Sequence, residues 1–200
     1  NLIQGTRREG ISFYGIDGDP ANVGEIIIQG NILSDCNQAD ETVGDACILV
    51  SGSCRNMQIK DNQLSASFGR GINMSGGSPR YLSIIGNHIT NCGDVGINLL
   101  DVKYCNISDN MIINDSDVGN PNSMEAGIRV VVAETPIYPR TGIMRNNIVA
   151  NTTAANIQLG GSAEAIDQWI VYDNNVEIGT FAYTDNSRIK GAVKRTLHAT

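Results

Sequence analysis

Apolar and polar residues along this chain recur in two short patterns that alternate with each other. The first pattern is apolar-x-x-Asn-x-apolar, which occurs six times. Its copies run from Ile28 to Leu33, Ile59 to Leu64, Ile84 to Ile89, Ile107 to Ile112, Ile143 to Ile148 and Val171 to Val176. The shared asparagines, separated by 31, 25, 23, 36 and 28 residues, are Asn31, Asn62, Asn87, Asn110, Asn146 and Asn174. A pattern that returns at such intervals is typical of a solenoid.

The second pattern is small-apolar-x-apolar, and its copies lie between those of the first. They begin at Gly10, Ala46, Gly71, Gly96, Gly127 and Asn156. Apolar and polar residues alternate in both patterns, which is the period of a strand, and no stretch of ten or more residues has the spacing of an amphipathic helix. The residues expected to point inward are Ile11/Phe13, Cys47/Leu49, Ile72/Met74, Ile97/Leu99, Ile128/Val130 and Ile157/Leu159. Those expected to point outward are Ser12, Asn73, Asn98, Arg129 and Gln158.

The spacing of the copies indicates which kind of solenoid forms. Leucine-rich repeats have a nearly fixed length with helical returns, whereas these intervals vary. The sequence therefore predicts an all-β fold, a parallel β-helix with coils of variable length. Asparagines at one corner of successive coils would then form a ladder of hydrogen-bonded side-chain amides.

These patterns, the unequal coils and the asparagine ladder resemble the right-handed parallel β-helices of the pectate-lyase-like superfamily. The resemblance extends over roughly residues 9 to 178 and is greatest for bacteriophage tailspikes and tail-fibre depolymerases. It implies a protein of the phage tail, folded in the host cytoplasm, that forms homotrimers and recognises a bacterial capsule or lipopolysaccharide O-antigen. A secreted protein is the alternative localisation.

Composition narrows the partners and the domain organisation. The 200 residues favour one domain, and the net charge of −7 argues against a nucleic-acid partner. No apolar run is long enough to span a membrane, and the missing initiator methionine suggests a fragment of a longer solenoid. We expect a β-helix over residues 1–178 and a capping or trimer-contact tail over residues 179–200. The five cysteines are odd in number and favour reduced thiols, with a disulfide as the alternative.

Charged residues recur just before the second pattern, where successive coils would stack them along one edge of a sheet. They are Glu9, Asp45, Arg70, Asp94 and Glu125. Glycoside hydrolysis uses two carboxyl groups about 5 to 5.5 Å apart in retaining enzymes and about 6.5 to 9.5 Å apart in inverting ones. Rungs about 4.8 Å apart allow both separations. The candidate acid and base are therefore Asp45, Asp94 and Glu125, with Asp101 and Glu134 as an alternative pair; a solvated edge without catalysis is the other reading.

Substrate binding is predicted for the polar outward residues near that edge. These are Arg70, Asn73, Asn98, Arg129 and Tyr14. Other aromatic residues that could stack on a sugar are Phe68, Tyr81, Tyr104, Tyr138 and Trp169.

No metal or other cofactor is expected. The outward strand positions lack the aspartate cluster that pectate lyases use for Ca²⁺, and the run that begins at Asp115 lacks the glutamate of a calcium loop.

Four apolar residues fall on predicted outward positions of the same sheet, where they would need to be covered. They are Ile48, Val50, Leu100 and Val131. A trimer interface is one explanation and a loop packed over the sheet is the other.

Three functions remain open at this point. The first is a tailspike-type protein that binds and hydrolyses a surface polysaccharide. The second is a non-catalytic receptor-binding or structural fibre module. The third is a secreted polysaccharide lyase or epimerase.

Overall fold

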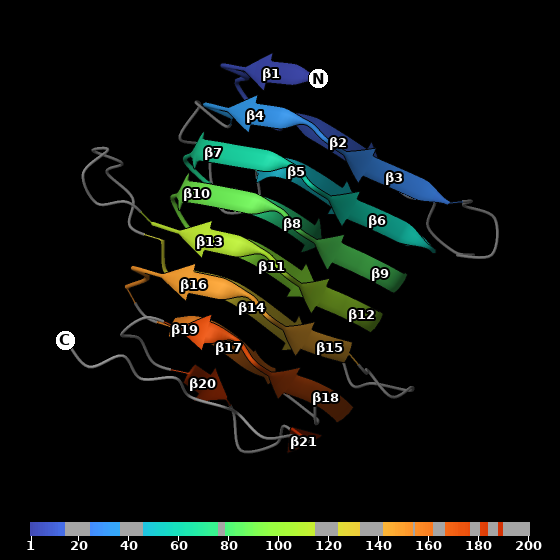
Figure 1. Ribbon diagram of the computed structural model, residues 1–200. Coiled ribbons are helices and arrows are strands. Elements are labelled where there is room, and N and C mark those ends of the chain that lie inside the picture. The colour runs from blue at the N-terminus through green and yellow to red at the C-terminus, as the bar shows by residue number, and fades with distance from the viewer. Residues whose placement is uncertain are drawn as a thin grey trace.

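The computed structural model shows a stack of parallel coils (Figure 1). It describes residues 1–14, 25–36, 46–75, 79–114, 124–132, 142–153, 155–161, 167–176, 181–183 and 188–189. Within these ranges the elements are strands, and no helix there is long and apolar enough to cross a membrane.

The strands form three sheets, and every pairing between them is parallel. The first sheet contains β1 (Leu2–Gln4), β4 (Ile32–Ser34), β7 (Gln63–Ser67), β10 (His88–Cys92), β13 (Met111–Ile113), β16 (Ile148–Ala150) and β19 (Asn175–Val176). The second contains β2 (Ile11–Tyr14), β5 (Ala46–Ser51), β8 (Arg70–Ser75), β11 (Val95–Leu100), β14 (Ala126–Val132), β17 (Ala155–Gly161) and β20 (Phe181–Tyr183). The third contains β3 (Ile26–Gln29), β6 (Met57–Lys60), β9 (Arg80–Ile85), β12 (Lys103–Ser108), β15 (Gly142–Arg145), β18 (Asp167–Tyr172) and β21 (Arg188–Ile189).

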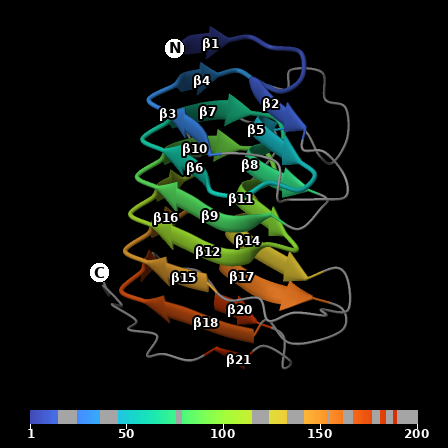
Figure 2. The ribbon, with the colours of Figure 1, turned by 90° about the vertical axis from the view of Figure 1, so that its right-hand side faces the viewer.

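Each coil contributes one strand to each sheet, and the coils follow one another down the stack (Figure 2). The expected all-β parallel β-helix is confirmed. Beyond residue 178, β20 pairs with β17 and β21 pairs with β18. The division at residue 178 and the capping or trimer-contact role of residues 179–200 stay predictions.

Columns of aliphatic side chains fill the interior of the stack. On the second sheet one inward column is almost completely buried and consists of Ile48, Ile72, Ile97, Ile128 and Ile157. Each such isoleucine contributes roughly 1.5–3 kcal/mol through burial. The alternation predicted for β8, β11, β14 and β17 is confirmed.

The predicted phase of β5 is wrong by one residue. Ile48 and Val50 pair with Ile72 and Met74 and point inward, whereas Leu49 lies opposite the outward Asn73. The run from Ala46 to Val50 is apolar throughout, so alternation gives no phase there and the neighbouring coil decides it.

This correction removes half of the predicted outward apolar set. Ile48 and Val50 are fully buried in the core, while Leu100 and Val131 lie opposite each other and are half-buried. Of the four residues from which a subunit interface was predicted, only Leu100 and Val131 therefore still lie on the outer face.

A ladder of asparagines, buried from Asn31 to Asn174, runs down the corner between the third and first sheets. Its members are Asn1, Asn31, Asn62, Asn87, Asn110, Asn147 and Asn174. Each Nδ2 donates to the Oδ1 of the next member at 2.8–3.0 Å. From Asn31 to Asn147, each backbone N–H donates to the same oxygen at 3.0–3.1 Å. From Asn62 onward, Nδ2 also donates to a carbonyl of the preceding coil.

The predicted ladder residue Asn146 is wrong, because Asn147 holds that position. Asn146 is exposed with φ +52°, whereas Asn147 is fully buried. The residue before each ladder asparagine turns the corner with a positive φ, and these residues are Gly30, Asp61, Gly86, Asp109, Asn146 and Asp173. Asparagine suits both positions, and the burial of Met144 in place of Ile143 fixes the register.

The glycine of the second pattern is required by close packing between the second and first sheets. A Cβ on Gly96 would lie 2.5 Å from Ile112 Cγ2 and 2.7 Å from the carbonyl oxygen of Gly127. Gly71 and Gly127 have equally short approaches.

All five cysteines are free and buried, which agrees with the expected reduced state. Burial raises the pKa of the Cys54 thiol to about 11. Burial, with smaller contributions from Cys36 and Asp94, raises the pKa of Cys92 to about 12. The hydrogen bond with the Cys47 side chain lowers the pKa of Cys36 to about 7.

The register of the ladder predicts that substitutions of two adjacent asparagines lower the stability by different amounts. Asn147→Ala removes the acceptor of the Asn110 backbone and side-chain N–H groups and should lower the free energy of unfolding by about 3 kcal/mol. Asn146→Gly keeps the positive φ and should cost less than about 0.5 kcal/mol. Denaturant titrations measure both, and a larger loss for Asn146→Gly would place the ladder at residue 146.

The buried thiols predict a loss of stability at alkaline pH. The folded-state pKa values of Cys54 and Cys92 lie above the ordinary 9.0, so their contribution is complete below pH 9 and disappears as the pH rises towards 11–12. Cys36 acts oppositely, because its contribution is lost as the pH falls through about 7. In thermal melts between pH 8 and 11, the Tm of Cys92→Ala should fall less steeply with rising pH than the Tm of the unaltered protein. Parallel curves would contradict the assignment.

Candidate functional site

The candidate site lies where the second-sheet strands begin. The backbone places Asp94 and Glu125 on consecutive coils, because Glu125 N–H donates to the Asp94 carbonyl at 2.6 Å. Asp94 N–H in turn donates to the Gly69 carbonyl at 3.0 Å, beside Arg70. The predicted proximity of Asp94 and Glu125 is therefore present in the structure. We call Arg70, Asp94, Glu125, Arg129 and Gln158 the ionic edge.

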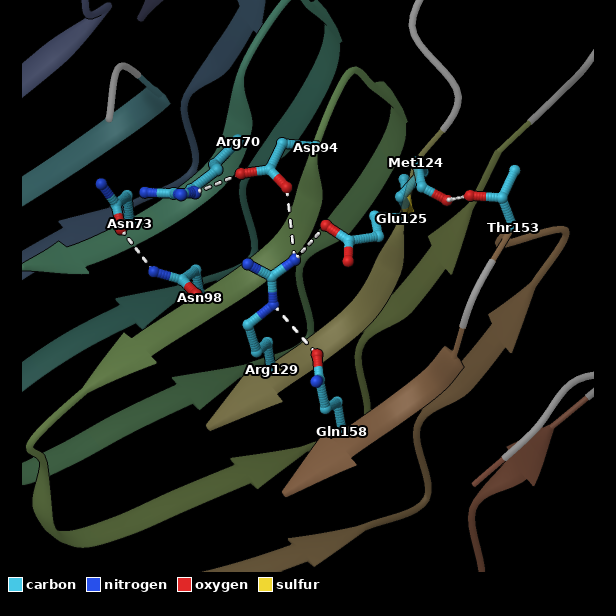
Figure 3. A network of polar contacts seen from close by, with 9 residues as sticks. All are labelled: Arg70, Asn73, Asp94, Asn98, Met124, Glu125, Arg129, Thr153 and Gln158. Carbon is cyan, nitrogen blue, oxygen red and sulfur yellow. Dashed lines mark hydrogen bonds and ion pairs between the residues drawn. The ribbon is translucent and has the colours of Figure 1, made fainter. Parts of the chain in front are cut away.

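Two arginines hold the carboxylates of the ionic edge (Figure 3). Arg70 Nε donates to Asp94 Oδ2 at 2.7 Å. Arg129 Nη2 reaches Asp94 Oδ1 at 3.3 Å and Glu125 Oε2 at 2.6 Å, while its Nε donates to Gln158 Oε1 at 3.1 Å. One guanidinium thus connects β14, β17 and the residues that precede β11 and β14.

Burial differs along the ionic edge. The side chains of Arg70 and Arg129 are 11% and 16% exposed, that of Asp94 is 28% exposed and that of Glu125 is 55% exposed. The more buried ion pairs are the more costly to break, because removal of one partner leaves a charge away from water. Glu125 and its contact with Arg129 are open to solvent and screened by salt.

The chemistry of the ionic edge is first that of an ion-pair network. Both carboxylates contact the same guanidinium here. These ion pairs therefore link adjacent coils, and the arrangement presents charged hydrogen-bonding groups at the surface.

Two of the predicted substrate-binding residues are buried beside this network. Asn98 Nδ2 donates to Asn73 Oδ1 at 2.9 Å, with Asn73 fully buried and Asn98 only 9% exposed (Figure 3). They occupy the outward column of the second sheet together with Arg129 and Gln158. Their part in substrate binding stays a prediction.

The remaining predicted site residues do not gather at the ionic edge. Asp45 and Glu134 lie outside the described residues. Asp101 follows the other end of β11, is buried and has φ +57°. Tyr14 is 66% exposed, as expected, but it ends β2 opposite Ser51, so its predicted place beside the carboxylate edge is wrong.

Two of the aromatic residues named as possible sugar-stacking surfaces, Tyr81 and Tyr104, form a stacked pair that the sequence analysis did not predict. Tyr81 and Tyr104 lie on adjacent third-sheet strands with ring centroids 5.0 Å apart and an interplanar angle of 9°. A signal was present, because each tyrosine stands six residues before a ladder asparagine, Asn87 or Asn110. Counting back from the ladder would have placed the two rings on one column.

Fold and site together define a parallel β-helix with an ionic edge on its second sheet. Residues 10–191 match the family model described as right handed beta helix region. The chain therefore belongs to the right-handed β-helix family.

The comparisons support the predicted fold and do not extend to phage tailspikes. No curated protein and no solved structure matches the chain. Because one fold carries many activities, the function is argued from the site.

The ionic edge predicts unequal stability losses for its two carboxylates. Asp94→Asn weakens both guanidinium contacts and leaves the largely buried Arg70 without its charged partner, so unfolding should become easier by about 2 kcal/mol. Glu125→Gln at the exposed position should cost less than about 1 kcal/mol. Urea unfolding curves of the two variants test this, and equal losses would show that the network does not stabilise the coils.

Proposed function

We propose that this protein binds a bacterial surface polysaccharide, capsule or lipopolysaccharide O-antigen, along the ionic edge, as the phage tailspikes that its repeats resemble do. The observation that carries the proposal is the linear row of polar groups over consecutive coils. Hydrogen bonds link Glu125 and Arg129 of one coil with Gln158 of the next, and all three side chains are at least partly open to solvent. A row with a repeat of about 4.8 Å per coil suits a linear polymer with repeated hydroxyl groups.

Hydrolysis of that polysaccharide is the second candidate function. It is favoured by the position of Asp94 and Glu125 on consecutive coils, since strands of a sheet lie about 4.8 Å apart and a retaining enzyme needs about 5 to 5.5 Å between its carboxyl groups. Asp45 stays a catalytic candidate beside these two residues, and Asp101 with Glu134 stays the alternative pair.

The phage-tail location and the homotrimer belong to the same proposal. Leu100 and Val131 form a half-buried apolar spot on the outer face of the second sheet, which a neighbouring subunit would cover. Light scattering coupled to size-exclusion chromatography should give three times the chain mass.

Binding is tested with purified capsule and O-antigen polysaccharides in affinity electrophoresis. Arg129→Gln should weaken retention about tenfold, since it removes charge-assisted hydrogen bonds. Gln63→Ala, at an exposed position of β7 on the first sheet, is the matched control and should bind normally. Equal retention of the Arg129→Gln variant would overturn the proposed binding edge.

The products of the same incubation separate the catalytic alternatives. A hydrolase releases reducing ends without unsaturated sugars, a lyase releases unsaturated sugars that absorb ultraviolet light, and a binding module releases neither. Hydrolysis that persists in both Asp94→Asn and Glu125→Gln would remove this pair from catalysis.

A further inference from the structure

Three cations occupy one position on three consecutive coils, at the start of the third sheet. Arg55 pairs with Arg80, and Arg80 pairs with Lys103. The backbone holds this register, since Arg80 N–H donates to the Cys54 carbonyl at 2.9 Å and Lys103 N–H to the Pro79 carbonyl at 2.8 Å. We call Arg55, Arg80 and Lys103 the cationic row. Figure 2 shows β9 and β12 on successive coils beneath β6, which begins two residues after Arg55.

Each of the two arginines of the cationic row has a polar atom that the described residues do not satisfy. The Nε atoms of Arg55 and Arg80 are buried and have no hydrogen-bond partner in the described part of the chain. Like charges on adjacent strands repel each other, and an unpaired buried donor is unfavourable. Such a group in a folded protein calls for an explanation, and a bound ion or ligand is one of the standard explanations.

The stacked tyrosines adjoin the cationic row along the chain. Tyr81 follows Arg80 and Tyr104 follows Lys103, and the two residues are 52% and 44% exposed. Their φ angles are +57° and +56°, a conformation that is unfavourable for any residue with a bulky side chain. Asn56, which precedes them by one coil in the same column, has φ +53° and is a residue that tolerates it. Bulky residues kept in this conformation are found preferentially at binding and active sites.

The two features together select a class of ligand. An aromatic ring open to solvent offers a face for the C–H groups of a sugar, and planar guanidinium groups bind carboxylate, sulfate or phosphate. A neutral sugar would need no cations, and an inorganic anion would need no aromatic rings.

We propose that the tyrosine pair and the cationic row form a binding site for an anionic sugar unit, separate from the ionic edge. The ionic edge lies where β11 begins, and the cationic row lies beyond the residue where β11 ends. The sugar ring stacks on a tyrosine, and its anionic substituent accepts hydrogen bonds from Arg55 and Arg80. The site does not depend on binding at the ionic edge.

The test compares matched charged and neutral oligosaccharides by isothermal titration calorimetry. One pair is an oligouronate and its carboxyl-reduced form, and the other is a sulfated oligosaccharide and its desulfated form. At least one anionic member should bind about tenfold more tightly than its neutral partner, and the pair that shows the difference identifies the anion. Equal or absent binding of all four would overturn the proposal.

Variants then assign the binding to the two features. The double variant Tyr81→Asn/Tyr104→Asn keeps a residue that tolerates positive φ and should weaken the anionic oligosaccharide about tenfold. Arg80→Gln should remove the preference for the anionic member. Gln63→Ala, the control on the first sheet, lies outside the site and should change neither. Circular dichroism establishes that each variant is folded.

Two further results decide whether sugar and anion are both recognised, and whether the site is separate. Two results together would show an anion site alone and overturn the sugar site. Inorganic sulfate would compete fully with the anionic oligosaccharide in the unaltered protein, and the tyrosine double variant would bind that oligosaccharide with unchanged affinity. Arg129→Gln at the ionic edge should leave this affinity unchanged. A loss in that variant equal to the loss in Arg80→Gln would overturn the separation of the two sites.

Discussion

The fold depends on the buried amide ladder between the third and first sheets. Each interior asparagine accepts two hydrogen bonds from one neighbour and donates to the next, so a missing member leaves polar groups unpaired where water cannot reach them. Slipping one coil by a residue would also turn its aliphatic side chains outward. The ladder therefore sets the phase of every column in the stack, including the columns that carry the ionic edge and the cationic row.

Sequence patterns were sufficient where a position tolerates few residue types. Five of the six predicted ladder asparagines are correct, because a buried amide that must both accept and donate restricts the choice strongly. The prediction was wrong at Asn146, where the corner turn and the ladder accept the same residue type in succession. It was wrong again in β5, where five consecutive apolar residues contain no alternation. Only contacts with the adjacent coil resolve these two cases.

The same limit explains which features of the ionic edge could be predicted from the sequence and which could not. Counting residues within each repeat placed Asp94 beside Glu125, because this prediction needs only the positions of the backbone. It could not show that Arg129, an outward residue of β14, extends back to both carboxylates, since side-chain direction is not contained in a repeat pattern. The carboxylates predicted as an acid and a base are thus also partners of ion pairs within the chain.

Stacked coils also bring identical charges together, and the chain resolves this in two ways. At the ionic edge, Arg70 and Arg129 lie close to Asp94 and Glu125, so the neutralising charge comes from the chain itself. At the cationic row, the Nε atoms of Arg55 and Arg80 have no such partner among the described residues. Two exposed, stacked tyrosines adjoin this row along the chain, which is why the proposed ligand has both a ring and a negative charge.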